Sequence, residues 1–403
     1  MSKAKKKTST SKRQIRSTSP SALFSFAKVK VIGVGGGGGN AVSRMSKDFI
    51  RGVEFVAVNT DAQDLDTISV KNKLYIGKNL TRGLGTGMNP ELGRQAAEEN
   101  RSEIAEAVQG ADLVFITAGF GGGTGTGVSP VVAEAAKQAG ALTIAVVTKP
   151  FSFEGSQRAR IAQEGILKLK DKVDALIVIP NDRIFSVINK DTSLLKAFES
   201  IDDVLRSAIH GIVELIATPG IVNLDFADVR VVMQDAGSAI VGVGIASGQE
   251  RAMNAVTQAV SSPLLEVTID GAKGVLLGIA GGRDLKMNEI NDIAKAVSEA
   301  VDSNAKIIFG AYHDRKLKAG QVKVTLIATG FSGAKPTHSL FAAGERENAF
   351  PLFASDEEKE PKIDFAKSEP VFKPADIYED EKKSEEKDGS AWDIPAFMRK
   401  KKR

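Results

Sequence analysis

Short apolar runs alternate with amphipathic stretches in the first half of the chain. The apolar runs, which predict buried strands, are 29–34, 53–58, 113–116, 142–147 and 175–179. The main stretches with helical periodicity are 41–49, 92–109 and 128–138. Uniformly apolar strands separated by helices are typical of a parallel sheet covered on both faces. The pattern predicts an α/β fold with a Rossmann-like parallel sheet, in which ligands bind at the carboxyl ends of the strands.

A longer amphipathic segment covers 194–217, with apolar residues at intervals of three and four. It predicts a single central helix about 35 Å long at about 1.5 Å per residue. The strands predicted after it are 229–233, 240–246, 275–280, 307–312 and 322–328, with only two helices, 250–261 and 286–303. We therefore expect an α/β domain over 27–193, the central helix, and a smaller α+β domain over 218–331.

Both ends of the chain lack periodicity. Residues 1–20 carry seven Lys or Arg and no acid, whereas 356–388 hold thirteen acids against seven bases. We expect a disordered basic tail over 1–26, with an organelle transit peptide as the alternative, and a disordered linker over 332–389. The final segment, 390–403, combines the only tryptophan with further apolar residues and a basic end, which favours a docking peptide.

Composition narrows the class of protein. The net charge of +4 comes largely from the ends, so it does not indicate a nucleic acid as the primary partner. The absence of cysteine excludes disulfides and thiolate metal sites. No apolar run reaches the roughly 18 residues of a transmembrane span. We expect a soluble protein of the cytoplasm.

Three glycine-rich loops follow predicted strands or precede predicted helices. The richest, 118–127, reads Ala-Gly-Phe-Gly-Gly-Gly-Thr-Gly-Thr-Gly, and the others cover 33–39 and 83–91. Free backbone N–H groups at a helix N-terminus form an anion cradle, and phosphate is the expected anion. The simpler alternative for 118–127 is a flexible surface loop.

The glycine spacing leaves the nucleotide open. Gly33, Gly35 and Gly38 also satisfy the dinucleotide fingerprint, with Asp61 as a candidate ribose ligand, so an NAD-dependent oxidoreductase is an alternative. The P-loop pattern with its lysine is absent. Phosphate charge would then fall on backbone N–H groups, threonine hydroxyls and a metal such as Mg²⁺.

The three loops, together with Asn-Leu-Asp-Phe-Ala-Asp at 223–228, resemble the tubulin/FtsZ family, and within it the members that act in bacterial cell division. The resemblance covers about 27–331, and 118–127 matches the family's signature loop. It implies a GTPase that binds GTP or GDP with Mg²⁺ held through the phosphates, and that polymerises head to tail. It also implies a division ring, or Z ring, at midcell.

The resemblance also assigns site residues. The phosphates would be held by Gly36, Gly37, Gly38, Gly39, Asn40, Gly121, Gly122, Gly123, Thr124, Gly125 and Thr126. The sugar would face Glu154 and Arg158. Phe198 would stack on guanine, while Asn181 and Asp202 would bind its edge. Phe198 and Asp202 are four residues apart and so share one helix face, which suits this role; taken alone, Phe198 would be a core aromatic.

Three further residues, Asn223, Asp225 and Asp228, follow the far end of the central helix, where they would not reach the phosphates of their own subunit. The resemblance implies that they orient a water molecule at the GTP of the next subunit. The alternative is that the two acids cap a helix or loop. A GTP-binding module that does not polymerise also stays open.

The C-terminal peptide would tether the polymer to membrane-bound division proteins. Its docking residues would be Asp393, Ile394, Pro395, Phe397 and Met398. Two positions depart from the family pattern: Ser43 stands where asparagine is usual, and Ile201 where a small residue is common. We expect modest changes in nucleotide affinity from both.

Overall fold

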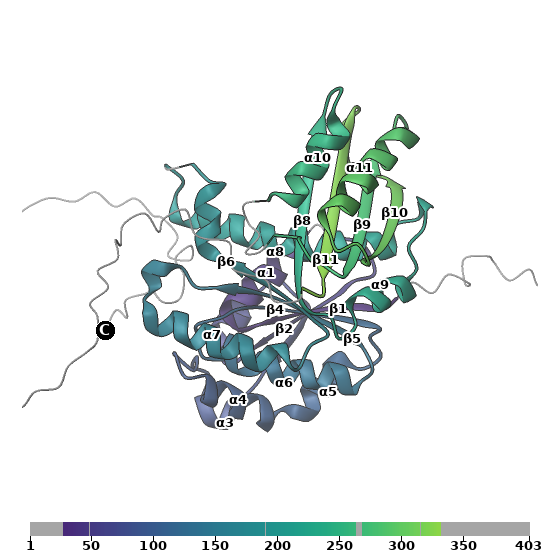
Figure 1. Cartoon of the computed structure of the whole chain (residues 1–403). Helices are drawn as coiled ribbons and strands as arrows, with labels where there is room; N and C mark the ends of the chain where they lie inside the picture. The colour runs from purple at the N-terminus through teal and green to yellow at the C-terminus, as the bar shows by residue number, and fades with distance from the viewer. Residues whose placement is uncertain (1–26, 48, 190, 263–267, 315, 332–403) are drawn as a thin grey trace, which may run out of the picture. The chain divides into compact units, whose positions relative to one another are not determined.

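In the part of the chain that the structure describes, eleven strands form one sheet in the order β3-β2-β1-β4-β5-β6-β8-β11-β9-β10-β7 (Figure 1). The computed structural model describes residues 27–331 except 48, 190, 263–267 and 315, so the predicted tails, linker and docking residues lie outside the described residues. The first six strands in this order are parallel: β3 (Asn72–Tyr75), β2 (Glu54–Asn59), β1 (Val29–Val34), β4 (Leu113–Gly119), β5 (Leu142–Lys149) and β6 (Ala175–Pro180). The predicted parallel sheet is confirmed.

Helices cover both faces of this parallel part. Successive strand residues point to opposite faces, and both faces carry apolar side chains that the helices bury. On β1, Val29 and Val31 join one buried cluster, while Ile32 and Val34 join another. The first cluster includes residues of α1 (Gly35–Met45), α2 (Ala62–Thr67), α8 (Leu194–Ala217) and α9 (Phe226–Met233). The second includes residues of α4 (Pro90–Glu99), α5 (Arg101–Val108), α6 (Thr124–Gln138) and α7 (Ser156–Lys170). A short helix, α3 (Lys78–Thr81), precedes α4.

The sheet continues into the predicted α+β domain. Its strands are β8 (Gly237–Ser247), β11 (Gln321–Thr329), β9 (Gly274–Gly281), β10 (Lys306–His313) and β7 (Gly220–Val222). In Figure 1, α10 (Arg251–Val260) and α11 (Met287–Ala300) lie together against these strands, and their apolar residues share a third buried cluster with β8, β9 and β11. The two parts of the sheet meet where β6 pairs with β8 through only three residue pairs, whereas β8 and β11 pair through nine.

The central helix α8 has the predicted bounds and packs against both parts of the sheet. Its Ile209 and Ile212 share a buried cluster with Val146 on β5 and Ile327 on β11. Helix and strands approach closely at two glycines: a Cβ on Gly278 would collide with Leu215, and a Cβ on Gly211 would lie 2.8 Å from the Thr325 side chain. Among the described residues no helix combines the length and the apolar character of a membrane span.

Several predicted elements need correction. Residues 229–233 were expected to form a strand but belong to α9, because Asp225 and Asp228 form a capping box that starts a helix there. The helix predicted over 92–109 is divided into α4 and α5 at Asn100. The buried side chain of Asn100 accepts a hydrogen bond from the Gly77 N–H (2.8 Å) and donates to Glu103 (2.9 Å). The helices predicted to start at 41 and 128 start at Gly35 and Thr124.

A buried ionic cluster links α8 to the second part of the sheet. Lys323 Nζ on β11 lies 2.7 Å from Glu214 on α8 and 3.0 Å from Asp314, and all three side chains are at most 13% exposed. His210 and Lys323 hold the pKa of the Glu214 carboxyl down at about 2, although burial opposes this. Because this pKa lies below that of the unfolded chain, the cluster stabilises the fold above pH 4 to 5 and loses that contribution at lower pH.

We expect Lys323→Met to lower the free energy of unfolding by about 3–5 kcal/mol, since it leaves two buried carboxylates without their cation. Chemical denaturation at pH 7 measures this, with the same change at exposed Lys318 as the control. A loss below about 1 kcal/mol would contradict the assignment of a stabilising cluster. The deficit should shrink on acidification, as the Glu214 carboxylate becomes protonated.

Candidate functional site

The glycine loops meet at the carboxyl ends of β1 and β4. These strands are neighbours in the sheet although β2 and β3 lie between them in the chain, so the strand order changes direction at this point. Such a switch point leaves a crevice between the connections that leave in opposite directions. The loop after β1 leads into α1, and the loop after β4 leads into α6.

The N-termini of α1 and α6 lie side by side at this switch point. A Cβ built on Gly35 would lie 3.0 Å from the Gly125 nitrogen, and one on Gly37 would lie 3.5 Å from the Gly119 nitrogen. Neither helix has a side chain that caps its first turn. Two uncapped N-termini present N–H groups and partial positive charge to the same space, which favours an anion.

The glycines of these loops differ in their roles. Within the two runs only Gly35 (φ +70°) and Gly121 (φ +98°) have positive φ. Gly38 and Gly39 are buried, and a Cβ on either would collide with the Thr117 carbonyl or with Ile68. Close backbone packing therefore explains why most of these positions are glycine. Both α1 and α6 begin within their glycine runs. Gly122 alone faces open space, with no atom within 4 Å of an added Cβ.

The threonine hydroxyls of the signature loop are bonded to the protein. Thr124 Oγ1 lies 2.9 Å from the hydroxyls of Thr60 and Thr86, and Thr126 Oγ1 accepts a hydrogen bond from the Gly121 N–H at 3.1 Å. Both threonines are buried. The sequence pattern had suggested hydroxyls directed at a phosphate or metal, whereas these hydroxyls hold the loop itself. Asn40 is exposed in the second turn of α1.

Glu154 and Arg158 lie beside the signature loop, where the sugar was predicted. Glu154 ends a short 3-10 turn (Ser152–Glu154) and accepts hydrogen bonds from the Phe151 N–H (2.9 Å) and Arg158 Nη1 (3.0 Å). A Cβ on Gly121 would lie 3.0 Å from the Arg158 carbonyl oxygen, which brings this pair next to the loop. The two charges offset each other, so together they can accept and donate hydrogen bonds without repelling an anion.

The predicted base contacts lie around the N-terminal half of α8. Asn181 starts a 3-10 turn (Asn181–Ser186) after β6, is 7% exposed, and its Oδ1 has no partner among the described residues. Phe198 is partly buried and packs edge-on against Phe151, with ring centroids 5.6 Å apart. An aromatic ring and an unpaired amide oxygen are the two kinds of group that bind a planar heterocycle with N–H donors.

One turn beyond Phe198, Asp202 is the most perturbed acid of this region. Burial raises the pKa of its carboxyl to about 7, and Arg44, whose Nε lies 3.4 Å away, opposes that rise only partly. Arg44 lies in the last turn of α1, so this one helix connects the anion cradle at its N-terminus to Asp202 at its C-terminus. A strongly perturbed acid near an anion cradle is typical of a functional site.

The three predicted catalytic residues lie elsewhere, around the edge strand β7 and the start of α9. Asn223 Oδ1 accepts a hydrogen bond from the Gly220 N–H (2.6 Å), and Asp228 Oδ2 accepts one from the Asp225 N–H (3.2 Å). The capping role considered for the acids is thus present. Asn223 and Asp225 are nevertheless exposed, and Asp228 is half-buried, so their remaining oxygens can reach another molecule.

The acidic loop is far from the cradle of the same chain. In the sheet order β7 is seven strands away from β4, and neighbouring strands are about 4.8 Å apart, which gives a separation of roughly 30 Å. The 24-residue helix α8 runs between the two regions, and its length of about 36 Å agrees. One subunit therefore does not bring Asn223, Asp225 and Asp228 to its own cradle.

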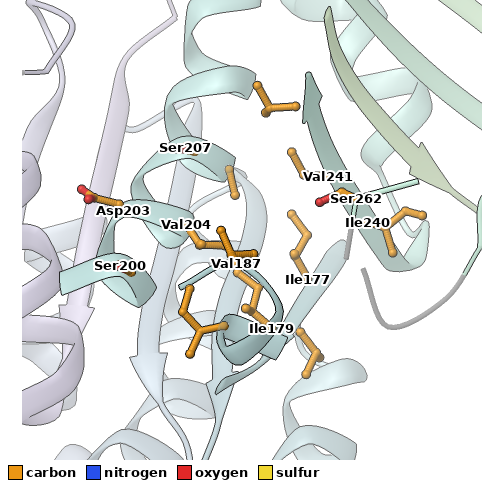
Figure 2. Close-up of a pocket in the computed structure, with 14 residues that line it drawn as sticks. Ile177, Ile179, Val187, Ser200, Asp203, Val204, Ser207, Ile240, Val241 and Ser262 are labelled. Carbon is orange, nitrogen blue, oxygen red and sulfur yellow. The ribbon is translucent and has the colours of Figure 1, made fainter. Parts of the chain in front are cut away.

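A separate cavity of about 370 Å³ lies between α8, β6 and β8. Figure 2 shows Val204 on α8, Ile177 and Ile179 on β6, and Val241 on β8 around it. Its lining is mostly apolar, and it contains none of the predicted site residues. It does not suit a phosphate-bearing ligand, so we do not assign the nucleotide to it.

The sequence did not identify Asn59, Thr60, Thr86 and Arg44 as parts of this region. Asn59, at the end of β2, is 2% exposed, and its Nδ2 has no partner among the described residues. The polar run that follows β2 and the glycine loop at 83–91 were the available signals. In the described part of the chain, no three His, Asp or Glu side chains come together as a metal site.

Comparison with known proteins gives the family. Residues 28–189 match the GTPase domain of the Tubulin/FtsZ family, and 237–332 match the C-terminal domain of the FtsZ family. An empty FtsZ dimer from M. jannaschii is 44% identical, covers 81% of this chain and 97% of its own, and has a TM-score of 0.73. A mutant FtsZ from M. jannaschii is 46% identical over 77% of this chain and 96% of its own, with a TM-score of 0.72.

The GTPγS-bound protofilament of CetZ2 from Haloferax volcanii shares the fold at 23% identity, with a TM-score of 0.67 over 77% of this chain and 95% of its own. The GTPase match replaces the alternative of an NAD-dependent oxidoreductase. Asp61, the candidate ribose ligand of that alternative, instead caps α2 by accepting from the N–H groups of Gln63 and Asp64. Its two matched domains, and its identity to FtsZ over most of its length, place this chain in the tubulin/FtsZ family.

Proposed function

We propose that this protein is a cytoskeletal GTPase that polymerises head to tail and hydrolyses GTP at the interface between subunits. The observation that carries the proposal is the separation of roughly 30 Å between the anion cradle and the acidic loop. Each is half of a site, and a second subunit supplies the missing half. A contact that joins two different faces in this way does not close, so it produces a filament.

Exposed apolar side chains at both ends support this interface. Around the cradle, the exposed fractions are 66% for Leu84, 63% for Phe153 and 55% for Phe185. Next to the acidic loop, Ile221 is 75% exposed and Val222 is 39% exposed. Large apolar side chains grouped beside polar site residues are typical of protein–protein interfaces.

In the proposed site, the N-termini of α1 and α6 hold the phosphates, while Asn181, Phe198 and Asp202 bind guanine. Glu154 and Arg158 face the sugar. Asn223, Asp225 and Asp228 of the next subunit orient the attacking water. Mg²⁺ bound through the phosphates would neutralise charge that develops on the transferred group. Positioning and charge stabilisation account for most of the catalysis of phosphoryl transfer, so a cradle and a polar loop suffice.

The cellular role that we propose is the cytoplasmic division ring at midcell. Support comes from the similarity to FtsZ and from the self-association that the names of two similar structures describe, one a dimer and one a protofilament. An alternative within the family is a GTP-binding module that does not polymerise.

GTPase activity per molecule is expected to rise steeply above a threshold protein concentration, because the complete site forms only between subunits. Phosphate release measured from below to well above the onset of light scattering tests this. Activity that stays constant per molecule down to the lowest concentration would favour the non-polymerising module and contradict a shared site. A protein that binds no GTP would overturn both.

We further propose that the C-terminal peptide tethers the polymer to membrane-bound partners. Removal of residues 393–403 should leave GTP-dependent light scattering within about twofold of the full chain, because the cradle and acidic loop are retained. A fluorescent fusion of the truncated protein should lose its membrane-associated localisation in cells. A full-length variant with 393–398 in scrambled order is the control for length, and normal localisation of that variant would contradict the docking role.

A further inference from the structure

Three buried threonine hydroxyls form a chain beneath the anion cradle. Thr124 Oγ1 lies 2.9 Å from Thr60 Oγ1 and 2.9 Å from Thr86 Oγ1. The three residues are 8%, 0% and 6% exposed. Thr60 follows β2, Thr86 lies in the glycine loop before α4, and Thr124 is the first residue of α6. A single side chain therefore connects three loops that are far apart in the sequence.

The central hydroxyl of Thr124 is the common partner of the Thr60 and Thr86 hydroxyls. A hydroxyl donates one hydrogen bond, so Thr124 can donate to one neighbour only while it accepts from the other. Removal of the central hydroxyl would leave two buried hydroxyls without this partner, and chains of hydrogen bonds strengthen one another in a low-dielectric environment. Thr60 is held further by its backbone, because its carbonyl oxygen accepts a hydrogen bond from the Thr81 hydroxyl at 3.3 Å.

Backbone packing holds the same loops together independently. The Gly123 N–H donates to the Gly87 carbonyl at 2.7 Å, and a Cβ on Gly93 would lie 2.7 Å from the Gly123 carbonyl oxygen. A Cβ on Gly127 would collide with the Pro90 carbonyl. The 83–89 loop and the start of α4 thus rest directly on the first turn of α6, where the uncapped N–H groups are.

We propose that Thr124 is a positioning residue whose hydroxyl makes the loop after β2, the 83–89 loop and the N-terminus of α6 order as one unit around the bound nucleotide. The inference rests on the proposed function for the identity of the ligand, and on the hydroxyl chain for the coupling. Thr124 acts through its neighbours, because its hydroxyl is committed to Thr60 and Thr86. A change that loosens one of these segments should then also increase the mobility of the other two.

The test compares Thr124→Val, which keeps the shape, with Thr124→Ser, which keeps the hydroxyl. Thr117→Val is the matched control, because Thr117 is also a buried β-branched threonine but its Oγ1 has no partner among the described residues. We expect Thr124→Val to weaken GDP binding about tenfold, or about 1.4 kcal/mol, with Thr124→Ser and Thr117→Val within about twofold of the parent. KM for GTP should rise by a similar factor, with kcat less affected.

Hydrogen exchange provides a measurement that does not depend on the ligand. In Thr124→Val without nucleotide, the backbone amides of 83–89 should exchange about tenfold faster while those of β9 and β11 stay unchanged. The sharper variant is Thr60→Val. The Thr60 hydroxyl is bonded to Thr124, which is in turn bonded to Thr86. If the three loops are coupled, loss of the Thr60 hydroxyl should also speed amide exchange in 83–89.

The outcomes separate the two proposals. If the parent protein binds no GTP, the proposed function fails, while the exchange experiment still decides the coupling. If the parent binds GTP but Thr124→Val matches Thr124→Ser in affinity and exchange, the positioning role is overturned. A Thr60→Val effect confined to its own loop would overturn the coupling. Should Thr124→Val not fold, the double variant Thr60→Val/Thr86→Val is compared with the two single variants. Coupled residues have non-additive effects, so effects on exchange that simply add would overturn the coupling.

Discussion

Asp228→Asn is expected to lower GTP turnover about 100-fold or more while GTP affinity and thermal stability stay close to those of the parent. Asparagine keeps an oxygen that can accept the Asp225 N–H, so the cap of α9 is retained. It loses the negative charge that orients and activates a water molecule, which typically contributes 10²–10⁴-fold. Phosphate release at saturating GTP, fluorescent nucleotide binding and a melting curve measure the three quantities.

The matched control is Asp171→Asn, an exposed acid between α7 and the start of β6, on the side of the sheet opposite to the strand ends that carry the cradle. It should turn over GTP normally. Loss of GTP binding in Asp228→Asn would show that Asp228 belongs to its own subunit's nucleotide site. Normal turnover would remove it from the mechanism.

Mixing two defective variants tests whether the site is divided between subunits. Gly122→Asp places a negative charge in the open space of the cradle without a clash, so it should repel phosphate. Its acidic loop stays intact, whereas Asp228→Asn keeps an intact cradle. At an interface between the two variants, one complete site forms, so the mixture should exceed the activity of either protein alone. A mixture no more active than the average of its components would argue against a shared site.

Asp202→Asn is expected to weaken GTP binding about 100-fold and, at the same time, to stabilise the nucleotide-free protein. A carboxylate accepts strong hydrogen bonds from the N–H groups of guanine, whereas an asparagine amide offers one acceptor and a conflicting donor. Without nucleotide, the buried charge destabilises the fold: burial raises the carboxyl pKa from its ordinary value of 3.8 to about 7, which corresponds to about 1–4 kcal/mol near neutral pH. Denaturation and nucleotide titration of both proteins measure the two effects.

The sign of the pH dependence follows from the same group. Its folded-state pKa lies above its unfolded value, so the destabilisation is absent below about pH 4 and grows as the pH rises toward 7. GTP affinity should change in the opposite sense, rising as the pH passes through 7 because the ionised form binds. Asp202→Asn should remove this part of both dependences. Parent and variant with parallel affinity profiles between pH 6 and 8 would contradict the guanine contact.

The sequence predicted the parallel sheet and the central helix well, because both rest on long hydrophobic patterns. It placed the starts of α1 and α6 too late, because glycine has a low helix propensity and only the fold reveals that Gly38 and Gly127 allow backbones to touch. The apolar segment 229–233 was predicted to be a strand, because so short an apolar run does not distinguish a strand from a helix. The cap at Asp225 makes it a helix.

The residues proposed for the site were assigned through a family resemblance, and that resemblance did not predict the contacts among them. The three-threonine chain depends on loops that approach only after folding, and nothing in the spacing of Thr60, Thr86 and Thr124 indicates it. The pairing of Arg44 with Asp202 depends likewise on α1 packing beside α8. Burial raises the pKa of Asp202, and burial of one acid in an amphipathic helix is not visible in its sequence.

The narrow pairing of β6 with β8 has a mechanical consequence. If subunits join through the cradle at one end and the acidic loop at the other, tension along the filament crosses every molecule between these two regions. The backbone path passes through only three residue pairs at β6 and β8, compared with six between β5 and β6 and nine between β8 and β11. The rest of the load falls on α8 and on its ionic cluster with Lys323. Apart from the two residue pairs that hold the edge strand β7 on β10, this is the narrowest junction in the sheet, and we expect a stretched filament to lengthen there.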